Sequence, residues 1–302
     1  MAPITTGTHP KLLWPGLHKI WGNLYEDQPL MHTKVFDANT SGKSYEETQE
    51  LAGFGLAPAK SEGASISYDT TVNGYVTRFT NVTYGLGFIV TEEAVEDNQY
   101  KEQAERRMKA LKRSMRHTKE TVFANILNRA TDSNYTGGDG KELLATDHPT
   151  SNGTQSNELA VAADLSEASI EDLLIQIRTA KDTRGLIMSL RAKKLIVPPN
   201  LEFEAERILK STLQNDNANN AINALKSTGS IPEGVLVWSF LTDTDQWFLK
   251  TDAPDGLKMF NRRALSFDKD SDFETGNFKH KATERFAGGW DDWRGIFGSP
   301  GA

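Results

Sequence analysis

The chain has 302 residues, of which 37% are hydrophobic and 25% are charged, and its formal net charge is −7. This composition is typical of a folded protein with a sizeable core and excludes an intrinsically disordered chain. The absence of cysteine excludes disulfides, a thiolate nucleophile and a cysteine-ligated metal site. The acidic balance argues against a nucleic-acid binder that uses its whole surface.

The sequence shows neither a secretion signal nor a membrane span. The first residues lack a basic segment followed by a long apolar run. The longest apolar stretch, 234–241, is far too short to cross a bilayer. We therefore expect no association with a membrane.

Residues 1–57 are expected to form an extended arm. Proline and glycine break any periodic pattern in this segment, and its aromatic residues are widely spaced. Such an arm is expected to lie across other surfaces, because large aromatic side chains are unfavourable in water. Trp14 and Trp21 are therefore candidates for contacts with another copy of the chain.

Residues 58–90 are predicted to form a β-hairpin. Two runs of strand-forming residues flank Asn73-Gly74, a dipeptide that favours a type I′ turn. The hairpin has too few large apolar residues to form a core, and a two-stranded ribbon is only marginally stable alone. We therefore expect a neighbouring chain to cover it. The candidate contact residues are Tyr75, Arg78 and Phe79.

Arg78 is the only cationic side chain from Ser61 through Tyr100. Its planar guanidinium can bind a carboxylate through two hydrogen bonds, and the chain is rich in acidic residues. Two interpretations follow from the sequence. Arg78 either binds a carboxylate of a neighbouring subunit or lies solvated on its strand.

One long helix is predicted over residues 91–131. Thr91 suits the N-cap position, acidic residues fill the first turn, and apolar residues recur at spacings of three and four. Asn98-Gln99 is a candidate position for a kink. Residues 101–120 hold eight cations and three carboxylates, a local balance of +5. This basic face is either solvated or faces a polyanion or an acidic neighbouring subunit.

The remaining chain alternates between helix and strand. A polar connection over 132–163 precedes a helix, strand and helix pattern over 164–262, which predicts a compact α/β unit. Residues 278–286 then alternate between apolar and basic positions and predict a strand with one basic face. The glycine-rich tail carries Trp290, Trp293 and Phe297, which we expect to be buried.

No motif in the sequence indicates catalysis. None of the six histidines has metal-ligand spacing, no serine lies in a Gly-x-Ser-x-Gly elbow, and no glycine pattern fits a nucleotide. The sequence therefore predicts no catalytic, cofactor-binding or metal-binding residue. A structural or assembly protein is favoured over an enzyme.

Several segments carry a resemblance to a known family. In their order and spacing they resemble the major capsid proteins of tailed bacteriophages, in particular the Mu-like major head subunit family. The segments are 53–63, 66–69, 84–97, 195–209 and 290–302.

The resemblance implies the Hong Kong 97-type capsid fold, an α+β fold. Its expected parts are an N-arm (1–57), an E-loop that reaches over a neighbouring subunit (58–90), a P-domain around the spine helix (91–163, helix 91–131), an A-domain (164–276) and a P-domain strand and tail (277–302). The implied function is that of a major head protein that self-assembles into an icosahedral shell around double-stranded DNA.

The resemblance also implies partners. Copies of the chain are expected to form pentamers and hexamers, with a portal protein, non-specifically packaged DNA and, as a further candidate, a decoration protein. Because only 57 residues precede the predicted hairpin, a scaffolding protein is expected to be separate. The expected location is the virion, after assembly in the host cytoplasm.

Two expectations concern charge. Some relatives cross-link a lysine of the E-loop, but residues 61–100 contain no lysine, so shells without covalent bonds between subunits are expected. Part of a basic set is expected to line the shell interior, unless acidic stretches such as 268–274 of an adjacent subunit pair with it. This set comprises Arg106, Lys109, Arg113, Lys279, Lys281 and Arg285.

The alternative function is an encapsulin-like shell that encloses enzymes.

Overall fold

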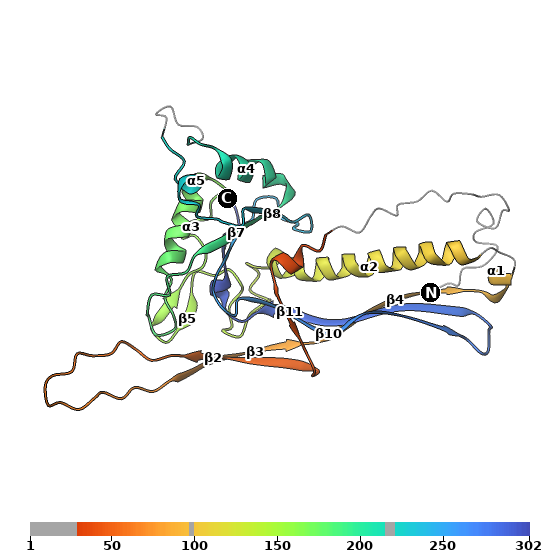
Figure 1. Ribbon diagram of the computed structural model, residues 1–302, viewed down its shortest axis with the longest axis horizontal. Helices are drawn as coiled ribbons and strands as arrows, with labels where there is room; N and C mark the ends of the chain where they lie inside the picture. Colours follow the sequence, from red (N-terminus) through yellow and green to blue (C-terminus); the bar gives the residue numbers. More distant parts are fainter. Residues whose placement is uncertain (1–28, 97–99, 215–220) are drawn as a thin grey trace.

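A sheet backed by one helix extends to the right of Figure 1. The computed structural model describes residues 29–96, 100–214 and 221–302. The sheet has the order β1-β10-β11-β4, in which β1 is parallel to β10 and the other pairs are antiparallel. We call this sheet together with α2 the wing. Its elements are β1 (Asp37–Thr40), β4 (Val82–Val90), β10 (Leu257–Ser271), β11 (Phe278–Trp290) and α2 (Tyr100–Asn128).

α2 covers one face of the wing sheet because an apolar stripe runs along the helix. Leu111, Met115 and Phe123 on this stripe are almost fully buried. They pack against alternate residues of β11, Ala282 and Phe286. Because side chains alternate along a strand, the odd-numbered residues of this stretch of β11 face the opposite side of the sheet.

A long helix is present within the predicted range 91–131, but the described residues place it at Tyr100–Asn128 as α2, with a separate short helix α1 (Glu92–Glu96) before it. The candidate kink at Asn98-Gln99 lies outside the described residues. A nearly buried ion pair joins the helix to the sheet, since Lys119 binds Glu284 and also contacts the Asn261 side chain at 3.1 Å. Both charges are paired and hydrogen-bonded, which such burial requires.

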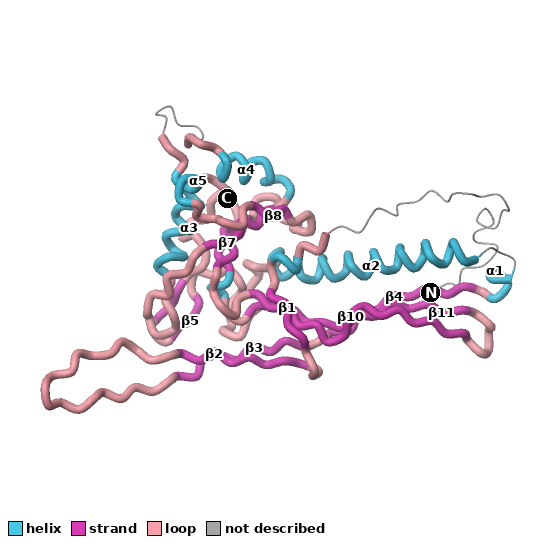
Figure 2. The backbone as a smooth tube through the Cα atoms, in the orientation of Figure 1, coloured by secondary structure: helices cyan, strands magenta, loops and turns pink. Residues whose placement is uncertain are grey.

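A second four-stranded sheet forms the centre of what we call the body, upper left in Figures 1 and 2. Its order is β12-β9-β7-β8, and helices α3, α4 and α5 pack on one of its faces. The Ser166 side chain accepts a hydrogen bond from the Ser169 amide and caps α3. The elements are α3 (Glu167–Thr179), β7 (Ala192–Val197), α4 (Glu202–Lys210), α5 (Ala224–Thr228), β8 (Val235–Val237), β9 (Trp247–Thr251) and β12 (Ile296–Ser299).

Short elements connect these units. They are η2 (His32–Lys34), the two-stranded sheet of β5 (His148–Thr150) and β6 (Gly153–Gln155), η3 (Pro199–Leu201) and η4 (Trp293–Gly295).

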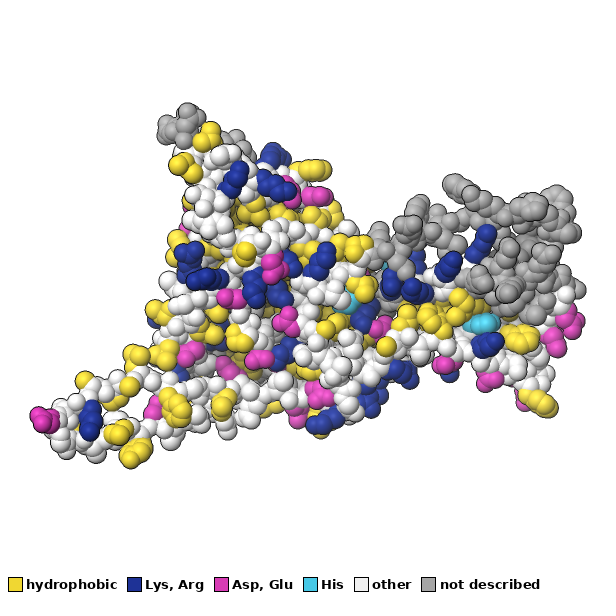
Figure 3. All heavy atoms as spheres, in the orientation of Figure 1, with side chains coloured by type: hydrophobic (Ala, Val, Ile, Leu, Met, Phe, Trp, Pro, Cys, Tyr) yellow, Lys and Arg dark blue, Asp and Glu magenta, His cyan; other side chains and the backbone are white. Residues whose placement is uncertain are grey.

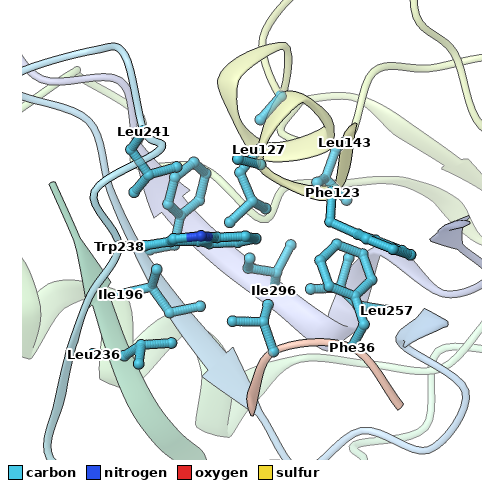
Figure 4. Close-up of a cluster of buried hydrophobic side chains, with 14 of the residues drawn as sticks. Phe36, Phe123, Leu127, Leu143, Ile196, Leu236, Trp238, Leu241, Leu257 and Ile296 are labelled. Atoms are coloured by element: carbon cyan, nitrogen blue, oxygen red, sulfur yellow. The ribbon is translucent and has the colours of Figure 1, made fainter. Parts of the chain in front are cut away.

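One hydrophobic cluster joins the wing and the body (Figure 4). Phe123 and Leu127 enter it from α2, Ile196 and Ile296 enter it from the body sheet, and Trp238 fills its centre. The Trp238 indole N–H donates to the buried Glu120 carboxylate at 3.0 Å. The two sheets therefore share one core and are held in a fixed relation.

The hairpin differs from the prediction. Its arms are β2 (Tyr45–Ala52) and β3 (Val72–Thr80), joined by the loop 53–71, so it begins inside the segment expected to be an arm. Asn73-Gly74 is not the turn but lies in β3, where the register with β2 shifts. The Glu50 side chain occupies the space that a Cβ of Gly74 would need. Gly74 therefore allows a β-bulge at this point of the ladder. We call β2, β3 and their loop the hairpin arm.

The unit expected over residues 164–276 also has different bounds in the structure. β10 lies within that range but pairs with β11 along most of its length and belongs to the wing. The tail is buried as expected, since Trp293 and Phe297 are 1% and 0% exposed and Trp290 is partly buried.

Replacing Phe123 with alanine is expected to destabilise the chain strongly. The ring is fully buried between the wing and the body, so its loss should lower the free energy of unfolding by about 3–5 kcal/mol. Chemical denaturation followed by tryptophan fluorescence measures this. The control Val161→Ala alters a side chain that is 79% exposed and should change stability by less than about 0.5 kcal/mol. Equal midpoints for the two variants would contradict the shared core.

The wing is expected to lose stability in mild acid. His280 stacks on Phe88 at 4.8 Å, and burial together with Lys269 on the adjacent strand lowers the pKa of His280 below 6.5. The unfolded chain therefore takes up the proton first, so the contribution of His280 is present above about pH 6.5 and is lost as the pH falls through the folded pKa. Thermal unfolding between about pH 8 and pH 5 should show this loss.

His280→Gln should flatten this dependence. His117→Gln, which changes an exposed histidine of α2, should leave it as in the parent chain. An unchanged pH profile in His280→Gln would refute the assignment.

Candidate assembly surfaces

The hairpin arm projects from the molecule, at the lower left of Figure 1. Its ladder ends at the pair Ala52 and Val72, and the loop 53–71 extends beyond it. A connection of this length without secondary structure is uncommon in a folded domain and is usually functional. The loop has no core of its own.

Large apolar side chains of the hairpin arm face solvent, as the yellow groups along the arm in Figure 3 show. Exposed apolar surface of this extent marks an interaction site on a soluble protein. The exposed fractions are 65% for Leu51, 60% for Phe54, 84% for Leu56, 66% for Ile66 and 94% for Tyr68.

The root of the hairpin arm is fixed on the sheet face opposite α2. Phe79 is 4% exposed and packs on Phe260 and Ala287, with 5.0 Å between the two phenyl centroids. The Tyr75 hydroxyl donates to the Asp291 carbonyl at 3.2 Å. Burial, aided by the carboxylates of Asp292 and Glu50, raises the pKa of Tyr75 above its usual range.

These positions change the expectations for the predicted contact residues. Phe79 is buried inside its own chain and is not available to a neighbour. Arg78 binds Glu47 of its own β2, with its Nη2 2.6 Å from the carboxylate, and lies over the Tyr45 ring. Both partners of this ion pair are substantially exposed. Trp14 and Trp21 lie outside the described residues.

The basic residues fall into two groups on opposite faces of the wing. Lys279, Lys281 and Arg285 occupy odd positions of β11 and so face away from α2. The helix carries Arg106, Lys109 and Arg113. One side of the wing therefore cannot present both groups, and at most one of them lines the shell interior, in keeping with the expectation that only part of the basic set does so.

The strand group is matched by acids of the same chain. Lys279 binds Asp272 at 2.7 Å, and the register of β10 and β11 places Asp268 opposite Lys281. The Arg285 guanidinium donates to the Asn81 carbonyl at 3.2 Å. The competing prediction paired these cations with the acidic stretch 268–274 of an adjacent subunit, whereas here that stretch lies beside Lys279 and Lys281 of its own chain.

In the pair Asp147-His148, the histidine has a structural role, because it packs and forms hydrogen bonds inside the protein. The His148 ring is fully buried, with Nδ1 2.6 Å from Asp139 and Nε2 3.1 Å from Asn157, and it stacks on Trp293. Asn157 in turn donates to the carbonyls of Leu143, Trp293 and Ile296. These contacts hold the connection between α2 and α3 against the tail.

Arg184, which sequence reasoning did not select, lies at the base of the exposed loop and contacts both of its ends. The only signal for it in the sequence is the turn-forming pattern Asp182-Thr-Arg-Gly185. Among the described residues, no group of three or more histidines and carboxylates is placed to hold a metal ion, and no helix is long and apolar enough to cross a membrane.

Comparison with known proteins relates these surfaces to a family. The model of the family described as phage capsid protein matches residues 74–298, which include most of the wing and nearly all of the body. No sequence match to a curated protein was found.

Solved capsids share the architecture. The capsid of cyanophage P-SCSP1u aligns with a TM-score of 0.60 at 9% identity, covering 98% of this chain and 94% of that one. The capsid of a native GTA particle aligns at 0.59 and 10% identity, covering 92% and 91%. The capsid of Myoviridae phage XM1 aligns at 0.53 and 13% identity, covering 94% and 95%. At these identities the likeness is one of fold, and the fold is the Hong Kong 97 type expected from the sequence.

Proposed function

The chain belongs to the phage capsid protein family, and from this premise we propose that it is a major capsid protein of the tailed-phage type whose copies form the icosahedral shell of a virion around double-stranded DNA. The observation that carries the proposal is the hairpin arm, whose apolar side chains find no cover within the described chain. A second copy supplies the missing cover.

The structural units suggest corrected bounds for the parts of the subunit. The hairpin arm, 45–80, is the E-loop, and it lies over a neighbouring subunit. The wing is the P-domain, and α2 is its spine helix. The body is the A-domain and contributes to the pentamers and hexamers. The Mu-like assignment of the sequence stays a proposal.

Arg78 has a different role in this proposal from the one first expected. Its ion pair with Glu47 joins the two strands of the hairpin arm. Because both side chains are exposed, the pair as a whole is available for contact with a neighbouring subunit. Exposed pairs of this kind contribute at most about 1 kcal/mol to stability, so the apolar loop residues dominate the contact.

We propose that the α2 face of the wing, and not the β11 face, lines the shell interior. On β11, Lys279 binds Asp272 and Lys281 lies opposite Asp268 in the ladder, so acidic residues of the same chain lower the net charge of that face. The region of α2 carries an excess of cations. Packaged phosphates require cations nearby, and contacts of this kind are independent of base sequence and sensitive to salt.

The remaining partners are proposed on family membership. They are a portal protein, a separate scaffolding protein and a decoration protein, with assembly in the host cytoplasm. A structural role also accounts for the lack of catalytic motifs. The encapsulin-like alternative is not favoured, because both the family model and the similar structures are those of phage capsids.

Assembly of the expressed chain tests the proposal. We expect closed shells by negative-stain microscopy, formed by the chain alone or with a scaffolding protein. Enclosed nucleic acid would support the phage shell, whereas enclosed protein other than the scaffolding protein, without nucleic acid, would support the encapsulin-like alternative. A monomer under all conditions would refute both.

The double substitution Leu56→Ser with Ile66→Ser should weaken assembly without unfolding the subunit. The side chains are 84% and 66% exposed, so the free subunit loses little packing. Each contributes about 1.5–3 kcal/mol when buried by a neighbour, which predicts that the concentration needed for assembly rises by at least about tenfold. Light scattering measures it. Glu62→Ser, which changes a polar residue of the same loop, is the control and should assemble like the parent.

Shells are expected to contain no covalent bonds between subunits. The chain has no cysteine, which excludes disulfides between subunits. Residues 61–100 contain no lysine, but Lys60 lies inside the exposed loop 53–71 and is the one residue of that loop that a lysine cross-link would use. We propose that Lys60 forms no such bond, so boiled shells should run as monomers on a denaturing gel and should dissociate in strong denaturant. A ladder of multimers would show that Lys60 or another group forms a cross-link.

A further inference from the structure

We infer that Arg184 is a positioning residue that fixes the direction in which the hairpin arm leaves the body. The inference rests on the proposed function in that the arm binds a second copy of the chain. It concerns a different property, the geometry of the arm in the free subunit.

Arg184 lies on a turn that is ordered by its own hydrogen bonds. The Asp182 carboxylate accepts from the amides of Arg184 and Leu186, at 2.9 and 2.8 Å. Gly185 has a φ of +87° and lies against Asn152, a position that a side chain would not tolerate. The Gln155 side chain donates to the Asp182 carbonyl at 3.1 Å. The turn is therefore a fixed support that belongs to the body.

From this turn the Arg184 side chain contacts both ends of the exposed loop. Its Nε donates to the Gly53 carbonyl at 3.0 Å, on the side of β2. Its Nη2 donates to the Thr70 carbonyl and lies 3.2 Å from both oxygens of Asp69, on the side of β3. One guanidinium thus spans the neck of the loop, a geometry that its rigid fork of donors allows.

Asp69 completes this cluster by joining the two ends directly. Its Oδ2 accepts from the Gly55 amide at 2.8 Å. Backbone hydrogen bonds from Gly55 and Thr70, with Arg184 in addition, lower the pKa of Asp69. The carboxylate is therefore charged near neutral pH and stays an acceptor for Arg184.

Other polar contacts hold the strands of the arm closer to its root, where Thr48 donates to the Asp291 side chain and the Tyr75 hydroxyl donates to the Asp291 carbonyl. Between the arm and the body lies a crevice of about 490 Å³, lined by polar residues that include Glu50, Thr183 and Arg294. Thr183 donates to Glu50 across the crevice. The apolar anchor of the arm, Phe79 on Phe260, lies further along β3. The exposed loop beyond these contacts can therefore change direction unless the polar contacts at its neck hold it.

Holding the neck matters because a mobile arm must be ordered before it can bind. Ordering costs conformational entropy at the moment of association, and a preorganised arm avoids that cost. Arg184 therefore increases the affinity between subunits without contacting the second subunit itself.

Hydrogen exchange of the unassembled full-length subunit tests the inference. In Arg184→Ala we expect the amides of Gly55 and Thr70, which donate to Asp69 at the neck of the loop 53–71, to exchange at least about tenfold faster, which corresponds to about 1.4 kcal/mol, while the thermal midpoint of the body is unchanged. Trypsin cleavage after Lys60, the only basic residue of the loop, should accelerate in parallel. Arg184→Lys keeps the charge but not the fork and should restore only part of the protection.

Two further variants make the result specific. Arg178→Ala removes an exposed arginine at the end of α3 and should exchange like the parent chain. Asp69→Ala should reproduce the effect of Arg184→Ala, and the double variant should add little, because the two residues act as one unit. Unchanged exchange of the Gly55 and Thr70 amides in Arg184→Ala would overturn the inference.

Assembly of the same variants separates this inference from the proposed function. Faster exchange with a raised assembly concentration supports both. Faster exchange with unaltered assembly would show that Arg184 positions the arm but that preorganisation does not govern association, which overturns that part of the inference. The proposed function fails only if the parent chain forms no shell.

Discussion

The buried carboxylate of Glu120 lies where the wing, the body and the segment before β1 meet. It accepts from the Trp238 indole and lies 2.7 Å from Nδ1 of His32, whose ring stacks on Phe123. A charged or polar group at 5% exposure is stable only when its hydrogen bonds are satisfied. This requirement fixes the three units relative to one another, because each contributes one partner. The orientation of α2, and hence of the whole wing, follows from it.

The two faces of the wing differ because α2 covers only one of them. Once α2 covers one side of the sheet, alternation along β11 decides which side chains enter the core and which face outward. Ala282 and Phe286 pack under the helix, and Lys279 is left on the other side beside Asp272. The charge distribution of the subunit is therefore a consequence of the register of one strand.

Elements with strong local patterns were predictable from the sequence. The apolar stripe of α2 and the alternation of β11 gave correct elements, and the burial of Trp293 and Phe297 followed from their size. The turn at Asn73-Gly74 was wrong because a local rule cannot show that the Glu50 side chain, from another strand, needs the space. The place of β10 was missed because strand pairing depends on partners distant in sequence.

The candidate site was less predictable than the fold. The sequence identified the exposed hairpin region but not its bounds, since the pairing of β2 with β3 spans a loop that no short-range signal marks. Arg78 was selected because it is isolated in sequence, yet Glu47 is its neighbour across the ladder. Arg184 was not selected, because its contacts with Gly53 and Thr70 join segments more than 100 residues apart.

The lack of a core in the hairpin arm makes its stability a collective property. The apolar side chains of 53–71 gain nothing from folding until another surface removes them from water. Their contribution therefore follows mass action, so it is negligible in a dilute solution of subunits and large in a closed shell, where every arm has a partner at a fixed distance. In such a chain, part of the favourable free energy of apolar burial is gained only when the subunits associate and the shell closes.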